Sequence, residues 1–200
     1  MTRSIYTLGL GAVLLFACND SNHPVSPQRT ITGPSATRTA SATQGSGAPK
    51  IVTFETMYGV DEAFINNSSI RGVKGDELPW EIGSATGSLN IGGHLVATIR
   101  GLVFADDPSV PPPLRGINDE PEFRGLVSCL VSESPGKGNG KAKVQTVNIL
   151  TGGFHASRGG NSDIDAHLQL PDDCVAPIIF IMAGSEDKWF SVMGAETSEE

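Results

Sequence analysis

Beyond residue 50, hydrophobic and polar residues alternate with a period of two along several stretches of the chain. In HLVATIRG, residues 94–101, the residues Leu95, Ala97 and Ile99 fall on one face. In EFRGLVSCLV, the face that we expect to be buried comprises Phe123, Gly125, Val127, Cys129 and Val131. A period of two is typical of β-strands, whose successive side chains point to opposite faces of a sheet. These stretches therefore predict strands with one buried side.

Other short β-like runs follow the same pattern, among them KIVTFETMY, KVQTVNIL, SDIDAHLQL, APIIFIMA and WFSVMG. Segments rich in Gly, Pro, Asn and Asp separate them and are typical of turns. The 24 glycines and 13 prolines point to many turns and little helix, and no amphipathic helix of three turns is evident. Many short strands divided by turns favour a sandwich or a barrel. We expect an all-β fold, a single antiparallel β-sandwich over residues 51–196, with a short tail at 197–200.

The tetrapeptide RGLV occurs twice, at residues 100–103 and 124–127, each time with a glycine inside a strand pattern. A glycine inside a strand marks a bulge or a place where a neighbouring group packs close. We therefore expect one of these two features at Gly101 and at Gly125.

The N-terminus has a different pattern. An uncharged apolar stretch runs from Ile5 to Ala17 behind the basic residue Arg3. The stretch is shorter than the ~20 residues that a membrane-spanning helix needs, and it suits the apolar part of a secretory signal peptide over residues 1–17. The alternative is a short buried helix at the start of a cytosolic domain.

Residues 19–49 are mostly Ser, Thr, Ala, Gly, Pro and Asn, without an aromatic residue. A segment of this composition buries too little apolar surface to offset the entropy that ordering costs. We interpret residues 18–50 as a disordered linker, with an irregular part of the fold as the alternative.

The string LFAC, which ends at Cys18, resembles a bacterial lipobox, with Leu15 at the third position before the cysteine and Ala17 directly before it. In that class the thiol carries a diacylglycerol and the signal is cut before the cysteine. The resemblance implies lipid attachment at Cys18, partnership with a membrane through that lipid, and a place in the bacterial cell envelope, periplasmic or surface-exposed. Two or more acyl chains give stable membrane attachment, whereas one is marginal.

The chain has three cysteines, and lipid on Cys18 leaves Cys129 and Cys174 as an even pair. An exported protein meets an oxidising compartment, so these two are expected to form a disulfide. The alternative is two buried free thiols.

Charge narrows the choice of partners. From residue 51 onward the chain has 10 basic and 21 acidic residues, without a Lys/Arg cluster. A domain this acidic repels phosphate backbones, so nucleic acid is not expected as a partner. An envelope protein or a glycan remains open as the partner.

The strand pattern SDIDAHLQL supplies the best candidate for chemistry. Its residues Asp163, Asp165 and His167 point to one side of a strand and carry groups that ligate cations. The alternative is a half-exposed strand that buries Ile164, Ala166 and Leu168. His94 and His155 are isolated in the sequence, and Trp80, Trp189 and Phe190 fit a core or its rim better than a ligand platform.

No signature of a catalytic elbow, a zinc protease or a phosphate-binding loop is present in the sequence. Strings such as FRGLVSCLV and CVAPIIF resemble exported bacterial proteins of uncharacterised function, over about residues 80–194. The string GSATGSLNIGGHLVATIRGLV faintly resembles the repeat of chordin-type domains, but no His-x-His pair follows Leu102. We expect a non-catalytic binding or structural module without a cofactor. The alternative is a divalent-cation-dependent enzyme or metal-binding protein that uses Asp163, Asp165 and His167.

Overall fold

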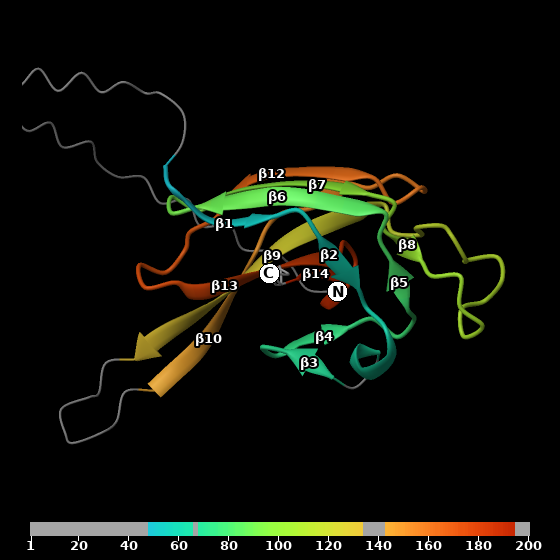
Figure 1. Ribbon diagram of the computed structural model, residues 1–200, viewed down its shortest axis with the longest axis horizontal. Helices are drawn as coiled ribbons and strands as arrows, with labels where there is room; N and C mark the ends of the chain where they lie inside the picture. Colours follow the sequence, from blue (N-terminus) through green and yellow to red (C-terminus); the bar gives the residue numbers. More distant parts are fainter. Residues whose placement is uncertain (1–47, 66–67, 134–142, 195–200) are drawn as a thin grey trace, which may run out of the picture. The chain divides into compact units, whose positions relative to one another are not determined.

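The computed structural model describes residues 48–65, 68–133 and 143–194 (Figure 1). The predictions for the signal peptide, for Cys18, for most of the linker and for the tail at 197–200 concern residues outside these ranges. Lys50, placed by sequence at the end of the linker, is already the first residue of a strand.

The first sheet has four antiparallel strands in the order β1-β6-β7-β12. Their bounds are β1 Lys50–Phe54, β6 Ser84–Asn90, β7 His94–Arg100 and β12 Ser162–His167. The expected faces of β7 are confirmed, because Leu95, Ala97 and Ile99 are all buried. Strand β12 is also as expected at Ile164, which is buried, whereas Ala166 is only half-buried.

The second sheet has eight strands, six of them in the order β10-β9-β13-β14-β4-β3, while β11 pairs with β9 and β2 pairs with β14. The longer strands are β9 Glu122–Glu133, β10 Lys143–Leu150, β13 Val175–Ala183 and β14 Lys188–Met193. The shorter ones are β2 Met57–Gly59, β3 Ser69–Ile70, β4 Val73–Gly75 and β11 Phe154–His155. A separate pair joins β5 Trp80–Glu81 to β8 Val103–Phe104.

The fold is all-β, as the sequence predicts, but it is not purely antiparallel. Strand β14 pairs in parallel with β4, so the second sheet is mixed. The polar string between β9 and β10 lies outside the described residues, and the two strands on either side of it pair antiparallel, with Lys143 opposite Glu133.

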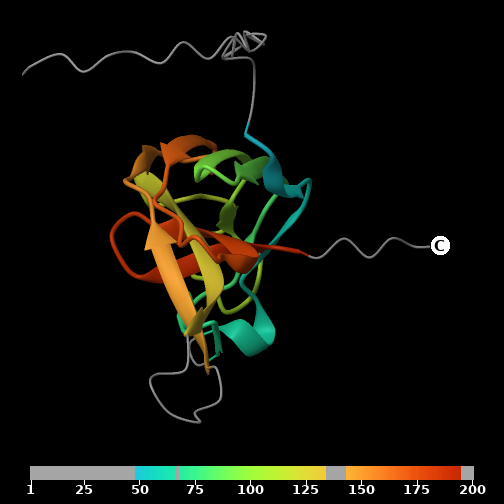
Figure 2. The ribbon, with the colours of Figure 1, turned by 90° about the vertical axis from the view of Figure 1, so that its left-hand side faces the viewer.

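The four-stranded sheet lies over β9, β13 and β14 in both views (Figures 1 and 2). Gly125 of β9 marks the contact, since a Cβ atom added there would lie 2.8 Å from Leu95 Cδ2 and 3.7 Å from Ile164 Cγ2. The close approach expected at Gly125 is thereby confirmed. Gly101 follows β7 instead of lying within it, and its φ of +69° is a conformation that favours glycine.

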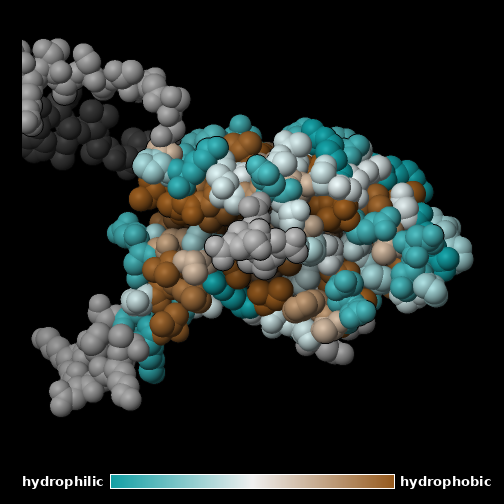
Figure 3. Space-filling model, viewed as in Figure 1, coloured by the Kyte–Doolittle hydropathy of each residue, from teal (hydrophilic) through white to brown (hydrophobic). Residues whose placement is uncertain are grey.

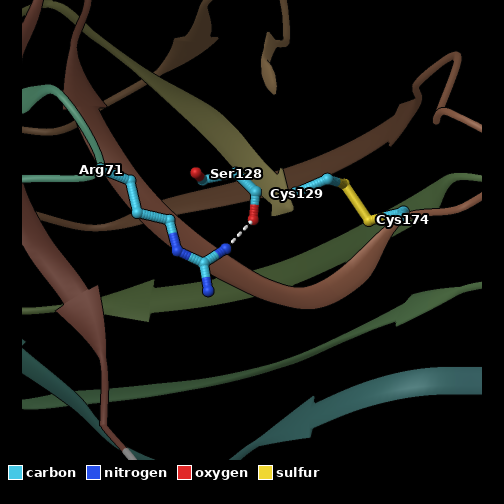
Figure 4. The surroundings of a disulfide bond; sticks show 4 residues. All are labelled: Arg71, Ser128, Cys129 and Cys174. Carbon is cyan, nitrogen blue, oxygen red and sulfur yellow. Dashed lines mark hydrogen bonds between the residues drawn. A yellow bond between two sulfur atoms is a disulfide. The ribbon is translucent and has the colours of Figure 1, made fainter. Parts of the chain in front are cut away.

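The second sheet also curls, so that its other face is covered as well. The Arg71 side chain, from the turn between β3 and β4, donates a hydrogen bond of 2.8 Å to the backbone oxygen of Ser128 on β9 (Figure 4). On this face Phe180 packs near Trp189, and Trp189 near Phe64. Phe64 belongs to a short 3₁₀ helix, Glu62–Phe64. The alternation in the sequence predicted one buried face for β9, whereas Leu126 and Ser128 on its second face are buried too.

The disulfide expected between Cys129 and Cys174 is present, with the two Cα atoms 4.9 Å apart (Figure 4). Cys129 lies in the middle of β9 and is fully buried. Cys174 directly precedes β13 and is half-buried. The bond therefore fastens the beginning of β13 to the neighbouring strand.

Over the three described ranges, no helix combines the length and the apolar character that crossing a bilayer would take.

Candidate functional site

Two groups of ionisable side chains on the described part of the chain are candidates for a functional site. One is the outer face of the β7–β12 pair, where the sequence placed its cation candidates. The other is a group of carboxyls around the connection from β4 to β5, which the sequence did not indicate.

Each of the predicted residues on β12 contacts a side chain of β7. Asp163 accepts two hydrogen bonds from the Arg100 guanidinium, at 2.9 and 3.2 Å. Asp165 Oδ1 lies 2.7 Å from His94 Nε2. The His167 ring stacks on the His94 ring, with 4.4 Å between centroids and 11° between planes. The row of Asp163, Asp165 and His167 is thus divided between the two ends of β7, and the structure does not bring the three side chains into one cluster.

His94 is the residue that the sequence analysis missed. It begins β7 after a tight turn in which Gly93 has a φ of +81° and the Asn90 side-chain oxygen accepts the His94 backbone N–H. Antiparallel pairing then sets His94 opposite His167 and Val96 opposite Asp165. Because the strands are antiparallel, the H-x-x-x-x-x-R pattern of β7 places His94 beside the x-D-x-H end of the D-x-D-x-H pattern of β12. It places Arg100 beside the first aspartate of that pattern. That complementarity would have indicated the pair, had the two strands been recognised as neighbours.

The second place is the cluster of Asp76, Glu77 and Glu186, whose carboxylate oxygens lie within 4.8 Å of one another. Asp76 is buried, with 6% of its surface exposed, and its Oδ2 accepts a hydrogen bond of 2.7 Å from Trp80 Nε1. Lys188 Nζ, at the start of β14, forms ion pairs with Glu77 and, at 3.3 Å, with Glu186. A hollow of about 230 Å³ opens beside this cluster.

Burial is the largest cause of the pKa shift of Asp76, and it raises that pKa to about 6. The hydrogen bond with Lys188 lowers the pKa of Glu77. Burial also lowers the pKa of Lys188, but the hydrogen bond to Glu77 and the charge of Glu186 outweigh it, so that the pKa of Lys188 is raised. The Lys188 ammonium group thus pairs with the carboxylates of both Glu77 and Glu186. The neighbouring Asp76 carboxyl is protonated below about pH 6.

Carboxyls with diverging pKa values are a common sign of acid–base chemistry, but internal ion pairs produce them too. Here the Lys188 ammonium already lies between Glu77 and Glu186, where a metal ion would have to bind. The indole of Trp80 occupies one oxygen of Asp76. These contacts join the β4–β5 connection to β14, so we interpret the cluster as a structural ion-pair network.

The aromatic residues considered as a ligand platform are buried in the core. Trp80 stacks on Phe190 with 3.8 Å between ring centroids, and Trp80 also contacts Phe104 at 4.2 Å. Each of these rings is at most 5% exposed, and Trp189 is 1% exposed. The expectation that Trp80, Trp189 and Phe190 are core residues is confirmed.

A hollow of about 410 Å³ with both polar and apolar lining residues lies beside β1 and the β6–β7 turn. Its lining includes the apolar residues Ile51, Ile91, Leu168, Leu170 and Pro171 and the polar residues Gln169 and Asp172. Ile91 is 64% exposed, and Val175, next to Cys174, is 57% exposed. Apolar surface also gathers at the end of the domain that carries the β9–β10 pair (Figure 3).

Comparison with protein-family models, with curated proteins and with solved structures found no match to this chain. The resemblances to a lipobox, to exported bacterial proteins and to chordin-type repeats therefore stay predictions.

Proposed function

We propose that this protein is a lipid-anchored protein of the bacterial cell envelope and acts there as a non-catalytic binding or structural module. The observation that carries the proposal is the disulfide between Cys129 and Cys174. It uses two of the three cysteines of the chain and leaves Cys18, at the end of the apolar N-terminal stretch, as the odd one. Lipid attachment accounts for the odd thiol.

The disulfide also supports a location outside the cytoplasm. Structural disulfides persist in oxidising compartments such as the periplasm and the cell surface, whereas cytosolic thiols are kept reduced. In this proposal residues 1–17 direct export, Cys18 holds the lipid, and residues 19–49 form the linker to the domain.

Two features support describing the domain as a β-sandwich. Gly125 brings β9 close to side chains of β7 and β12, and the buried apolar residues of both sheets belong to one core. The curl of the second sheet and its parallel β14–β4 pair are departures from a simple sandwich. Sandwich domains serve many roles, so the architecture alone does not define an activity.

A non-catalytic role is supported by how the polar groups are used. The buried carboxyl of Asp76 is held by Trp80, and Lys188 joins its neighbours Glu77 and Glu186. The hollow near Ile91 offers a place to hold a partner, an envelope protein or a glycan. The alternative function, a cation-dependent enzyme that uses Asp163, Asp165 and His167, has less support because Arg100 engages both oxygens of Asp163.

The anchor is tested by metabolic labelling. The full chain is produced in a bacterium supplied with an alkyne-bearing fatty acid, which is later coupled to a fluorophore. Wild type is expected to carry the label, and Cys18→Ser to carry none. The Cys129→Ser/Cys174→Ser double variant is the matched control, since it changes two cysteines and should keep the label. An unlabelled wild type, or a labelled Cys18→Ser protein, would overturn the proposal.

A further inference from the structure

His94 and His167 form a cross-strand pair on the exposed face of the first sheet. The two residues are directly opposite in the β7–β12 ladder, and their rings lie 4.4 Å apart. We propose that His94 and His167 together bind a divalent transition-metal cation such as Zn²⁺, Ni²⁺ or Cu²⁺, with Asp165 orienting the imidazole of His94. This site is separate from the lipid anchor and goes beyond the proposed function.

The spacing of the pair suits two nitrogen ligands of one ion. Residues directly opposite in an antiparallel pair have Cβ atoms ~5 Å apart and point to the same side of the sheet. Imidazole nitrogen is a ligand that zinc, copper and nickel accept. The rings are stacked in parallel, so the His167 ring must turn about its side-chain bonds for one of its nitrogens to converge with Nδ1 of His94 on an ion. Both lie at the surface, with the His94 side chain 33% exposed, which leaves room for that rotation and for water ligands.

Asp165 occupies the position of an orienting carboxylate. In metal sites a ligating histidine usually donates its other ring N–H to a carboxylate, which fixes the tautomer and the ring. The 2.7 Å contact between His94 Nε2 and Asp165 Oδ1 matches that arrangement. A proton on Nε2 leaves the Nδ1 lone pair of His94 available for the metal.

Asp163 is not part of this site. It lies four residues from His167 along β12, a separation of ~13 Å between Cα atoms in an extended strand. Its carboxylate is held by Arg100 at the opposite end of β7. The sequence predicted a site of Asp163, Asp165 and His167, whereas the inferred site contains His94 in place of Asp163. The experiment tests which of these two residues metal binding requires.

Zn²⁺ is titrated calorimetrically into the full chain in mild detergent near neutral pH. Wild type is expected to bind one ion per chain. His94→Gln and His167→Gln should each weaken binding by about tenfold or more, and Asp165→Asn by ~10–100-fold. Asp163→Asn tests the sequence-predicted set, and His155→Gln, which removes an exposed histidine from β11, is the matched control. Both should stay within about twofold of wild type, because neither residue is part of the inferred site.

Two further measurements distinguish a loss of metal binding from a loss of folding. The thermal midpoint of each variant without metal shows whether it is folded. The electron paramagnetic resonance spectrum of Cu²⁺ on wild type should show coupling to two imidazole nitrogens and needs no variant. The inference is overturned by wild type that binds no Zn²⁺, by one or no coupled nitrogen, or by an Asp163→Asn loss as large as that of His94→Gln.

Discussion

Cys174 is joined to Cys129 at the place where the ladder between β9 and β13 changes register. Val175 pairs with Leu130, but the next paired residue, Ile178, lies opposite Ser128. Ala176, between these pairs, has a φ of +46°, which is uncommon for a residue with a side chain. The covalent bond secures β13 where its hydrogen bonds to β9 are interrupted.

Removing this crosslink is expected to destabilise the domain strongly. The two cysteines are 45 residues apart, and in the chain-entropy model a loop of that length contributes about 4 kcal/mol. The Cys129→Ala/Cys174→Ala variant should therefore unfold at much lower urea concentration than wild type. Wild type treated with reductant should shift in the same direction, whereas equal midpoints for all three samples would contradict the structural role.

The strands that sequence predicted best are those with one buried face. Alternation placed Leu95, Ala97 and Ile99 in the core because β7 has solvent on its other side. The curl of the second sheet was not predictable in this way. It depends on β4, a strand of three residues, and on the reach of Arg71 to Ser128, which are 57 residues apart. Strands this short carry too little pattern, and a strand covered on both faces shows no clear alternation.

The candidate site residues were likewise predictable within a single strand but not across strands. Asp163, Asp165 and His167 were found because they lie within one strand. His94 lies 73 residues before His167, and only the pairing of β7 with β12 brings them together. Asp76 was missed because the string GDELPW has the composition of a turn, and its burial depends on packing against β14.

Asp76→Asn is expected to remove a pH dependence of stability. The pKa of Asp76 is about 6 in the folded protein and about 4 in the unfolded chain. Between these values the folded state binds more protons, so this group's contribution is full below pH 4 and is lost as the pH rises through 6. Relative to the variant, wild type should lose about 2–3 kcal/mol of unfolding free energy between pH 4 and pH 7.

Urea unfolding at several pH values measures this difference. Asparagine keeps an oxygen for the Trp80 indole, so the variant tests the charge and not the hydrogen bond. If the Asp76→Asn curve ran parallel to that of wild type, the raised pKa of Asp76 would be refuted.

Lys188→Met should destabilise the domain at neutral pH. It removes the ammonium group that pairs with both Glu77 and Glu186 beside Asp76, at an expected cost of about 1–3 kcal/mol. The loss should shrink near pH 4, where carboxyls take up protons. Lys74→Met is the matched control, since Lys74 is opposite Lys188 in the β4–β14 pair but is exposed. Equal effects of the two substitutions on the urea midpoint would argue against a structural ion-pair network.

Gly87→Ala tests the packing of the first sheet. A Cβ atom on Gly87 of β6 would overlap the ring of Phe54 and the backbone oxygen of Val96. Because Phe54 is buried and the oxygen belongs to a paired strand, the expected cost is about 2 kcal/mol or more. Gly152→Ala, where a Cβ would have no neighbour within 4 Å, should change the thermal midpoint little. A Gly87→Ala protein as stable as Gly152→Ala would contradict the packing described here.

The central claim assigns one cysteine to a lipid and two to each other, and the mass of the intact protein tests it most directly. The full chain is recovered from bacterial membranes with a thiol-blocking reagent and weighed without reductant. We predict a polypeptide that begins at Cys18, is heavier by a diacylglyceryl group with or without a further acyl chain, and carries no blocking reagent. A chain that still begins at Met1, or one with blocked thiols at residues 129 and 174, would contradict the account.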